Sequence, residues 1–194
     1  MGQKSAESSN NSTASPRAKS FDKAFGYLGV PQDFLNNDAD EVDGQYETSS
    51  WFWGHYIRSR EGVIDVKKPL FNAFLKGRTA IVNGNSEKRK EAVDEIKTQW
   101  EKLIAANVVH YINSTLTDME SDDKFSKWHH WSEAKAFHTC LAYNDDKSIS
   151  DSDWQDINNL LGSSPKQVKQ SDLEDANQKL KQVFNFSNSQ MSNL

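Results

Sequence analysis

The stretch KWHHWSEAKAF, residues 127–137, contains the two residues whose types and spacing are best suited to chemistry in this chain. Glu133 follows His130 by three residues, and on a helix this spacing places an imidazole and a carboxylate one turn apart on the same side. Such a pair can ligate a metal ion or exchange protons with a substrate. It can equally be a structural hydrogen bond, because a buried imidazole needs a polar partner.

The position of the pair on its helix bears on these alternatives. At about 100° of rotation per residue, His130 lies inside an apolar arc, Glu133 lies on the flank of that arc, and His129 faces away. A metal site needs three or four ligands, and the other histidines of the chain show no matching pattern. We therefore favour a structural polar pair of His130 and Glu133. The alternative is that these two residues bind a metal ion, iron or zinc, or a small ligand.

Apolar residues recur at steps of three and four along most of the chain, which is typical of amphipathic helices. The strongest pattern covers 86–119, and another covers 123–143, which contains His130. Shorter helices are expected at 16–28, 51–60, 66–83, 151–161 and 171–184. No segment shows the period-two alternation of a strand. The sequence predicts an all-α protein with an irregular up-and-down helical bundle.

Capping residues mark several of the expected helix ends. Ser15 followed by Pro16 is typical of a helix start, and Gly29 of a helix end. Asp65 is expected to cap the helix at 66–83. The sequence SDLE at 171–174 fits a capping box, in which Ser171 begins the last helix.

The two ends of the chain are rich in Ser and Asn and poor in apolar residues. Such segments bury too little apolar surface to offset the chain entropy lost on ordering. We expect residues 1–17 and 186–194 to be disordered and residues 18–185 to form one helical domain.

A short pattern, aromatic–x–x–Ala–x–x–aromatic, occurs twice, in SFDKAFGY at 20–27 and in HWSEAKAF at 130–137. Its recurrence predicts two related half-bundles. The polar residues do not recur, since Ser20 stands at the position of His130 and Lys23 at that of Glu133. This difference favours the structural interpretation of the pair.

Composition excludes several classes of protein. The net charge of −5 argues against a nucleic-acid partner, because phosphate binding needs a surplus of Lys and Arg. Cys140 is the single cysteine, so no intrachain disulfide can form. No apolar run approaches the ~18 residues of a membrane span. The first 20 residues lack the apolar core of a secretory signal, so we expect no signal peptide and no transmembrane segment in this chain.

Three consecutive aromatic residues, Trp51, Phe52 and Trp53, open the predicted helix at 51–60. They can cap the core of the bundle or meet a partner protein. Core capping is favoured, because exposed apolar patches are uncommon in monomeric proteins.

Five stretches, in this order and spacing, resemble a known family. They are FDKAFGYLGVPQDF (21–34), WFWGHYIRSREG (51–62), FLKGRTAI (74–81), AANVVHYIN (105–113) and HHWSEAKAF (129–137). Together they resemble the domain of unknown function 4856 family over about residues 18–185. That family is similar to the imelysin-like proteins of bacterial outer membranes and periplasm.

The resemblance implies a helical fold of two similar bundle halves in secreted or lipid-anchored proteins of Gram-negative bacteria, periplasmic or associated with the outer membrane. Imelysin-like proteins carry a Gly-x-His-x-x-Glu motif linked to iron-responsive systems and a proposed peptidase activity. Trp128 stands at the glycine position here, so only His130 and Glu133 match. Members usually begin with a signal peptide and a further helical segment, and we expect this chain to lack that N-terminal part.

These observations lead to two expectations of function. The first is a non-enzymatic binding or surface protein of the bacterial cell envelope, whose partner is a protein or a small ligand. The alternative is a metal-binding or hydrolytic imelysin-like protein that uses His130 and Glu133 with iron or zinc.

Overall fold

The computed structural model describes residues 15–36, 41–42, 45–46, 51–121 and 123–194. Within these ranges the chain forms eight helices and one pair of short strands. The helices are α1 (Pro16–Leu28), α2 (Trp53–Ile64), α3 (Lys67–Val82), α4 (Ser86–Ser121), α5 (Lys124–Cys140), α6 (Asp151–Leu161), α7 (Gln170–Phe184) and α8 (Asn188–Asn193). Strands β1 (Glu41–Val42) and β2 (Gln45–Tyr46) pair antiparallel. The prediction of an all-α helical bundle is confirmed.

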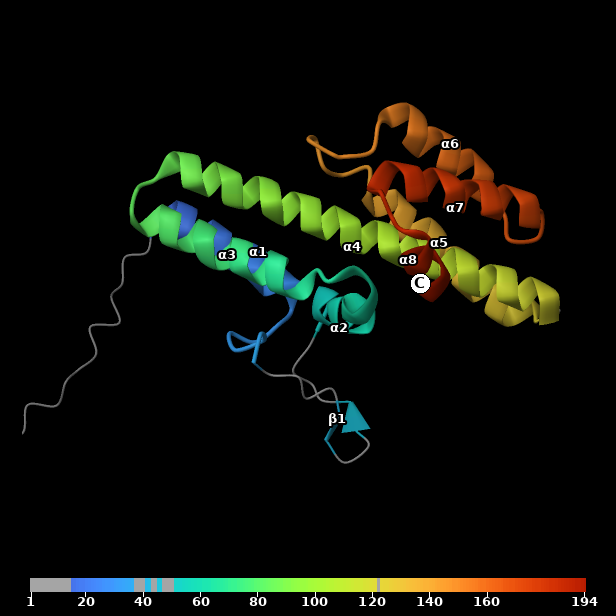
Figure 1. Ribbon diagram of the computed structural model, residues 1–194, viewed down its shortest axis with the longest axis horizontal. Coiled ribbons are helices and arrows are strands. Elements are labelled where there is room, and N and C mark those ends of the chain that lie inside the picture. Colours follow the sequence, from blue (N-terminus) through green and yellow to red (C-terminus); the bar gives the residue numbers. More distant parts are fainter. Residues whose placement is uncertain (1–14, 37–40, 43–44, 47–50, 122) are drawn as a thin grey trace, which may run out of the picture.

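Helix α4 is the central element of the bundle. It has 36 residues, which at 1.5 Å per residue corresponds to a length of about 54 Å. Figure 1 shows α3 beside the first half of α4, and α5 folded back along its second half. Short turns precede and follow α4, so its neighbours run antiparallel to it, as the sequence predicts for 86–119 and 123–143. Helices α6 and α7 pack together over this second half.

Helix α1 packs against α3 through aromatic side chains. The ring of Phe25 meets Phe71 and Phe74 edge-on, and Phe21 meets Phe74 in the same way. Close approach depends on Gly77, where a Cβ atom would lie 2.4 Å from Cζ of Phe21. The glycine that interrupts the apolar stripe of α3 is thus the position at which α1 packs closely against α3.

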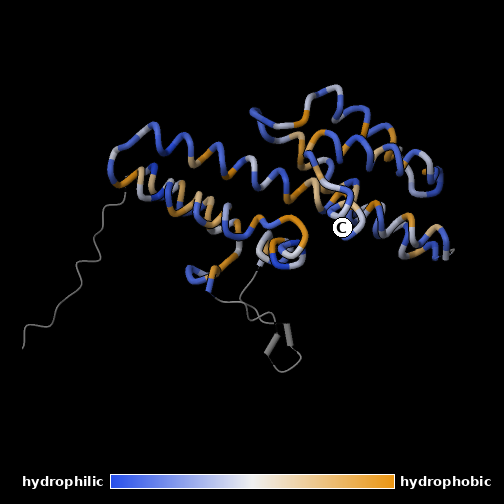
Figure 2. The backbone as a smooth tube through the Cα atoms, in the orientation of Figure 1, coloured by the Kyte–Doolittle hydropathy of each residue, from blue (hydrophilic) through white to orange (hydrophobic). Residues whose placement is uncertain are grey.

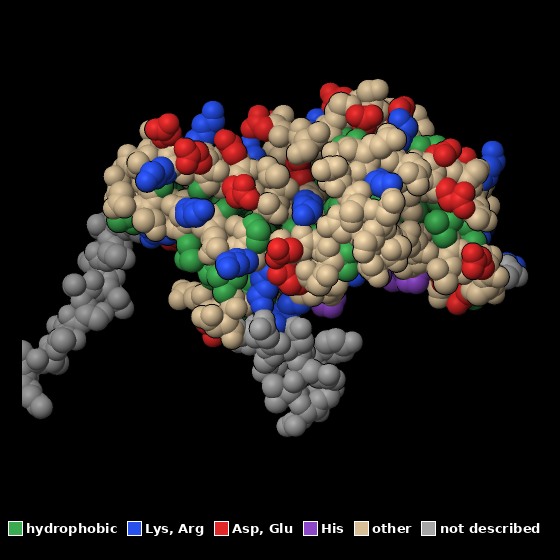
Figure 3. All heavy atoms as spheres, in the orientation of Figure 1, with side chains coloured by type: hydrophobic (Ala, Val, Ile, Leu, Met, Phe, Trp, Pro, Cys, Tyr) green, Lys and Arg blue, Asp and Glu red, His purple; other side chains and the backbone are tan. Residues whose placement is uncertain are grey.

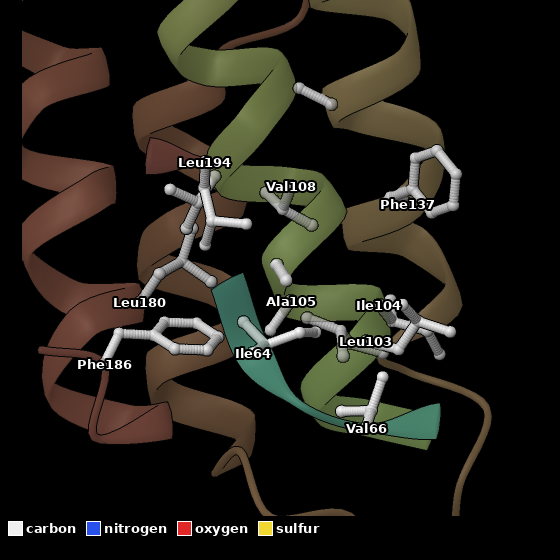
Figure 4. Close-up of a cluster of buried hydrophobic side chains, with 14 of the residues drawn as sticks. Ile64, Val66, Leu103, Ile104, Ala105, Val108, Phe137, Leu180, Phe186 and Leu194 are labelled. Atoms are coloured by element: carbon white, nitrogen blue, oxygen red, sulfur yellow. The ribbon is translucent and has the colours of Figure 1, made fainter. Parts of the chain in front are cut away.

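The core joins distant parts of the chain at the middle of α4. Figure 4 shows Leu180, Phe186 and Leu194 pointing toward Ile64 and the face of α4 that carries Val108. All five of these side chains are buried. Figure 2 shows the corresponding alternation of hydrophilic and apolar residues along the helices.

The C-terminal segment is ordered, so the expectation of a disordered tail at 186–194 is wrong. Ser187 caps α8, and its hydroxyl and the side chain of Gln190 form a reciprocal capping box. Leu194 is 6 % exposed. The segment is polar in composition, and the capping box, the hydrogen bond from Gln190 to the oxygen of Val63 and the burial of Leu194 hold it in place. Of the expected disorder at 1–17, residues 1–14 lie outside the described residues, and α1 begins at Pro16 with Ser15 as its cap.

Two expected caps are also wrong. Asp65 does not cap α3 but ends α2 in the left-handed conformation, with φ of 49°. Helix α7 begins at Gln170, one residue before Ser171, and its N-cap is Lys169 without a side-chain hydrogen bond. Of residues 31–50, those at 37–40, 43–44 and 47–50 lie outside the described residues. No helix in the described part of the chain combines the length and apolar character needed to cross a bilayer.

Candidate functional site

The partner of His130 comes from α4 and not from its own helix. Nδ1 of His130 lies 2.6 Å from Oδ2 of Asp118. Among the described residues no hydrogen bond joins His130 to Glu133. The turn between α4 and α5 places Asp118, in the last turn of α4, opposite the second turn of α5. His130 is half-buried and His129 is exposed, in the directions that the helical wheel predicts.

The bond to Asp118 fixes the chemistry of the imidazole. A carboxylate only accepts hydrogen bonds, so Nδ1 of His130 is the donor. The lone pair of the neutral ring is then on Nε2. The side chain of His130 is 29 % exposed and that of Asp118 is 14 % exposed. This is the arrangement in which an imidazole nitrogen can bind a cation or accept a proton at the surface.

Glu133 faces two tyrosines from other helices, Tyr56 of α2 and Tyr111 of α4. Burial and then the negative charge of Glu133 raise the pKa of Tyr56. Burial, Tyr56 and Glu133 raise the pKa of Tyr111. Both phenols therefore keep their protons at neutral pH, and the two tyrosine side chains hydrogen-bond to each other.

Arg60 of α2 interacts electrostatically with the same two tyrosines. Its Nε donates to Oδ1 of Asn107 at 3.2 Å, and Asn107 is fully buried. Burial lowers the pKa of Arg60, but a guanidinium stays charged at neutral pH. No carboxylate among the described residues forms an ion pair with it. Arg60 is thus a half-buried cation whose protein partner is a neutral amide.

Three helices build this region with residues spaced by four. Helix α2 supplies Tyr56 and Arg60, α5 supplies Glu133 and Phe137, and α4 supplies Tyr111. The ring of Tyr111 is stacked on Phe137, with centroids 5.6 Å apart and planes 13° apart. Tyr56 meets the same ring edge-on at 4.9 Å. We call these five residues the Arg60–Glu133 cluster.

His110, which no sequence pattern singled out, lies next to the Arg60–Glu133 cluster. Its Nδ1 is 2.5 Å from the backbone oxygen of Leu194, the residue that follows α8. Burial and then the charge of Arg60 lower the pKa of His110, so the imidazole is neutral at pH 7. Figure 3 shows histidine side chains at the lower edge of the molecule, beside Lys and Arg side chains.

Of the three consecutive aromatic residues at 51–53, one caps the core of the bundle and two are exposed, as a partner-binding surface would require. Trp53 is half-buried and packs edge-on against Phe137 at 5.8 Å, so it covers the core at the Arg60–Glu133 cluster. Trp51 and Phe52 are 60 % and 70 % exposed. Phe52 has φ of 50°, a conformation that non-glycine residues rarely adopt.

Metal binding in this region is limited by the small number of side chains that could act as ligands. Within the described ranges, no group of three or more His, Cys, Asp or Glu side chains is arranged to hold a metal ion. The Arg60–Glu133 cluster instead contains a cation, a carboxylate and two hydrogen-bonded phenols that pack on an aromatic ring. Such an arrangement can bind a small polar molecule by hydrogen bonds and opposite charges.

The sequence patterns single out His130 and Glu133. They do not reveal Asp118, which binds His130, or the other members of the cluster, Tyr56, Arg60 and Tyr111. A usable signal existed in the spacing of four between Tyr56 and Arg60, which places both on one face of α2. The contacts between these helices depend on the tertiary fold, so the residue pattern of a single helix cannot predict them.

The geometry defines an all-α bundle with a charged and aromatic cluster at the junction of three helices. The family model described as "Domain of unknown function (DUF4856)" matches residues 7–186 of the chain. The chain belongs to this family, as the five stretches indicate. No curated protein and no solved structure matches the chain.

Proposed function

We propose that this chain is a non-enzymatic binding module that holds a small polar ligand at the Arg60–Glu133 cluster. The observation that carries the proposal is the environment of Arg60. Its guanidinium is half-buried and bonded to the neutral side chain of Asn107, with no carboxylate partner among the described residues. Withdrawing a charge from water without a counter-charge is costly, and an anionic group of a ligand would supply that counter-charge.

A ligand screen by thermal shift tests the proposal. A compound that binds only the folded state raises the melting temperature by mass action. We expect some small anionic or polar compounds to raise the melting temperature of the wild type and to have little effect on Arg60→Gln. The matched control is Arg17→Gln on the exposed side of α1, which should respond as the wild type does. Equal responses of the wild type and Arg60→Gln would overturn the proposal.

The metal-binding or hydrolytic alternative has its own observation, the bond between Asp118 and His130. Ligating histidines commonly donate their second ring nitrogen to a carboxylate, and Nδ1 of His130 does so. Glu133 would be the second ligand. Zinc or iron(II) should then raise the melting temperature, and His130→Ala and Glu133→Ala should each abolish the rise. This outcome would favour the metal-binding function over the binding of a small polar ligand.

We also propose that the protein acts in the bacterial cell envelope, periplasmic or associated with the outer membrane. The similarity of its family to imelysin-like proteins supports this location. Fractionation of cells that express the native gene with a C-terminal epitope tag tests it, and recovery of the tagged protein with cytoplasmic markers would overturn it.

A further inference from the structure

We infer that the groove between α3 and the first half of α4 is the surface through which two copies of this chain form a dimer. The groove has a volume of about 930 Å³, and no member of the Arg60–Glu133 cluster lines it. Figure 1 shows α5, α6 and α7 along the second half of α4, so these helices leave the groove open. The inference does not rest on the proposed function.

The groove follows the line along which the two antiparallel helices meet. Ala73, Ala80 and Ala92 are buried in its floor, and Leu75, which is 53 % exposed, lines it on the α3 side. Polar side chains of both helices form the two rims. A groove of this kind can receive the side-chain ridges of a facing helix.

The charged side chains of the two rims differ in sign. Helix α3 contributes Lys76, whereas α4 contributes Glu91 and Glu95, with Lys88 nearer the turn. None of these four side chains forms an ion pair within the part of the chain that the structure describes. Exposed charges without partners in their own chain are available to a surface of complementary charge.

The rim of α3 is complementary to the rim of α4 in a second copy. Gly77 and Ala92 lie at the same level along the groove, since a Cβ atom on Gly77 would be 3.2 Å from Cβ of Ala92. Lys76 and Glu91 each precede these residues by one position, so their levels differ by only about 3 Å. A twofold axis parallel to the groove places α3 of each copy over α4 of the other. Lys76 of one copy then faces Glu91 of the second copy, and symmetry repeats this contact.

The next helical turn adds a second complementary contact. Asn72 lies one turn before Lys76, and Glu95 lies about one turn after Glu91, so the same rotation brings the amide of Asn72 to the carboxylate of Glu95 in the second copy. The product is a four-helix bundle in which every helix runs antiparallel to its two neighbours. This agreement of the surface with itself is the reason for choosing a second copy as the occupant.

The size of the groove determines how stable the dimer is. Helix α3 has 16 residues and is therefore about 24 Å long, and two helices side by side are about 20 Å wide. Contact over this surface buries on the order of 500 Å² in each copy, which is at the lower end of the range for specific interfaces. We expect a reversible dimer with a Kd in the micromolar range.

Sedimentation velocity at protein concentrations that span the micromolar range tests the inference. The mean mass of the wild type should rise with concentration from that of a monomer toward that of a dimer. Lys76→Glu and Glu91→Lys should each weaken the dimer at least about tenfold, because each introduces two contacts between like charges. The double variant exchanges the two charges and should dimerise as the wild type does. The control is Lys23→Glu on the exposed side of α1 and outside the groove, which should leave the dimer unchanged.

A crosslinking experiment shows whether the contact joins two copies. A carbodiimide links a lysine to a carboxylate through an amide bond, and a mixture of isotope-labelled and unlabelled protein distinguishes links between chains from links within one. We expect a link from Lys76 of one copy to Glu91 of the other. A monomer at every concentration would overturn the inference, as would a link between these residues within single chains only. A dimer that both single variants leave unchanged would place the interface on another face and would also overturn it.

Discussion

The imidazole of His138 lies flat on the indole of Trp154, with ring centroids 4.8 Å apart and planes 16° apart. Two reciprocal hydrogen bonds of 3.0 Å accompany this stack, since Nε1 of Trp154 donates to the backbone oxygen of His138 and Nε2 of His138 donates to that of Trp154. His138 is fully buried. The pair fastens α6 to α5, and the burial of the ring favours the neutral imidazole.

The stability of the fold should therefore fall in mild acid. Burial lowers the pKa of His138 to about 4 from an ordinary value of 6.5. Between these values the unfolded chain binds a proton that the folded chain does not, so the free energy of unfolding decreases as the pH falls. The full loss is on the order of 3 kcal/mol, since one pKa unit corresponds to about 1.4 kcal/mol. Urea denaturation between pH 7 and pH 4 measures it.

The control for this prediction is His138→Phe, which keeps an aromatic ring against Trp154 and removes the titrating group. Its stability should be lower than that of the wild type at pH 7 but should vary less with pH. His129→Ala, which removes an exposed histidine, should keep the wild-type dependence. A dependence on pH that is the same in His138→Phe would show that another group causes it.

His138 also shows which part of the fold the sequence could not reveal. The helical wheel of α5 located the face toward α4, because Phe137 and Leu141 mark it with large apolar residues. The face toward α6 contains Trp131, His138 and Lys135, and a polar residue on it gives no sign of burial. A helix between two neighbours buries two faces, and periodicity identifies the more apolar one.

The long helices were predictable because each contains several turns of repeated apolar spacing, and α4 begins and ends within two residues of the expected limits. Helix α8 was not, because its order comes from the side chain of Gln190, the oxygen of Val63 and the burial of Leu194. The candidate site could be predicted from the sequence only in part. The inward direction of His130 follows from its helix, whereas its partner Asp118 depends on how α4 and α5 meet.

The contact between α1 and α3 predicts opposite effects for two glycine-to-alanine changes. In Gly77→Ala the new Cβ would lie 2.4 Å from Cζ of Phe21 and 3.2 Å from Cβ of Ala92, so the ring of Phe21 must shift in its packing against Phe74. Crowding of this kind costs about 1–3 kcal/mol and outweighs the gain in helix propensity. We expect a net loss of about 1 kcal/mol by chemical denaturation.

The matched change is Gly26→Ala in α1, where a Cβ meets nothing within 4 Å. Helix propensity alone then applies, and the variant should gain roughly 0.5–1 kcal/mol. A stabilised Gly77→Ala would mean that α1 is not held closely against α3.

The ordered C-terminal segment predicts a large effect at Leu194. Its side chain is buried beside Ile64 and Leu180, so Leu194→Ala should lower the free energy of unfolding by about 2–3 kcal/mol. Exposed Ser192→Ala should change it by less than ~0.5 kcal/mol. Chemical denaturation of both variants measures the difference. An effect of Leu194→Ala as small as that of Ser192→Ala would show that α8 does not pack on the core in solution.

The last prediction concerns the partner of His130, for which sequence and structure differ. The sequence favours Glu133, and the structure places Asp118 at 2.6 Å from Nδ1. A double-mutant cycle of His130→Ala and Asp118→Asn should give a coupling energy of about 1 kcal/mol, the usual contribution of a partly buried hydrogen bond. The same cycle with Glu133→Gln should give less than ~0.5 kcal/mol, as expected for residues without a shared bond. His129→Ala, which is exposed, provides the baseline for removing a histidine from α5. A coupling to Glu133 as large as that to Asp118 would restore the polar pair that the sequence predicts.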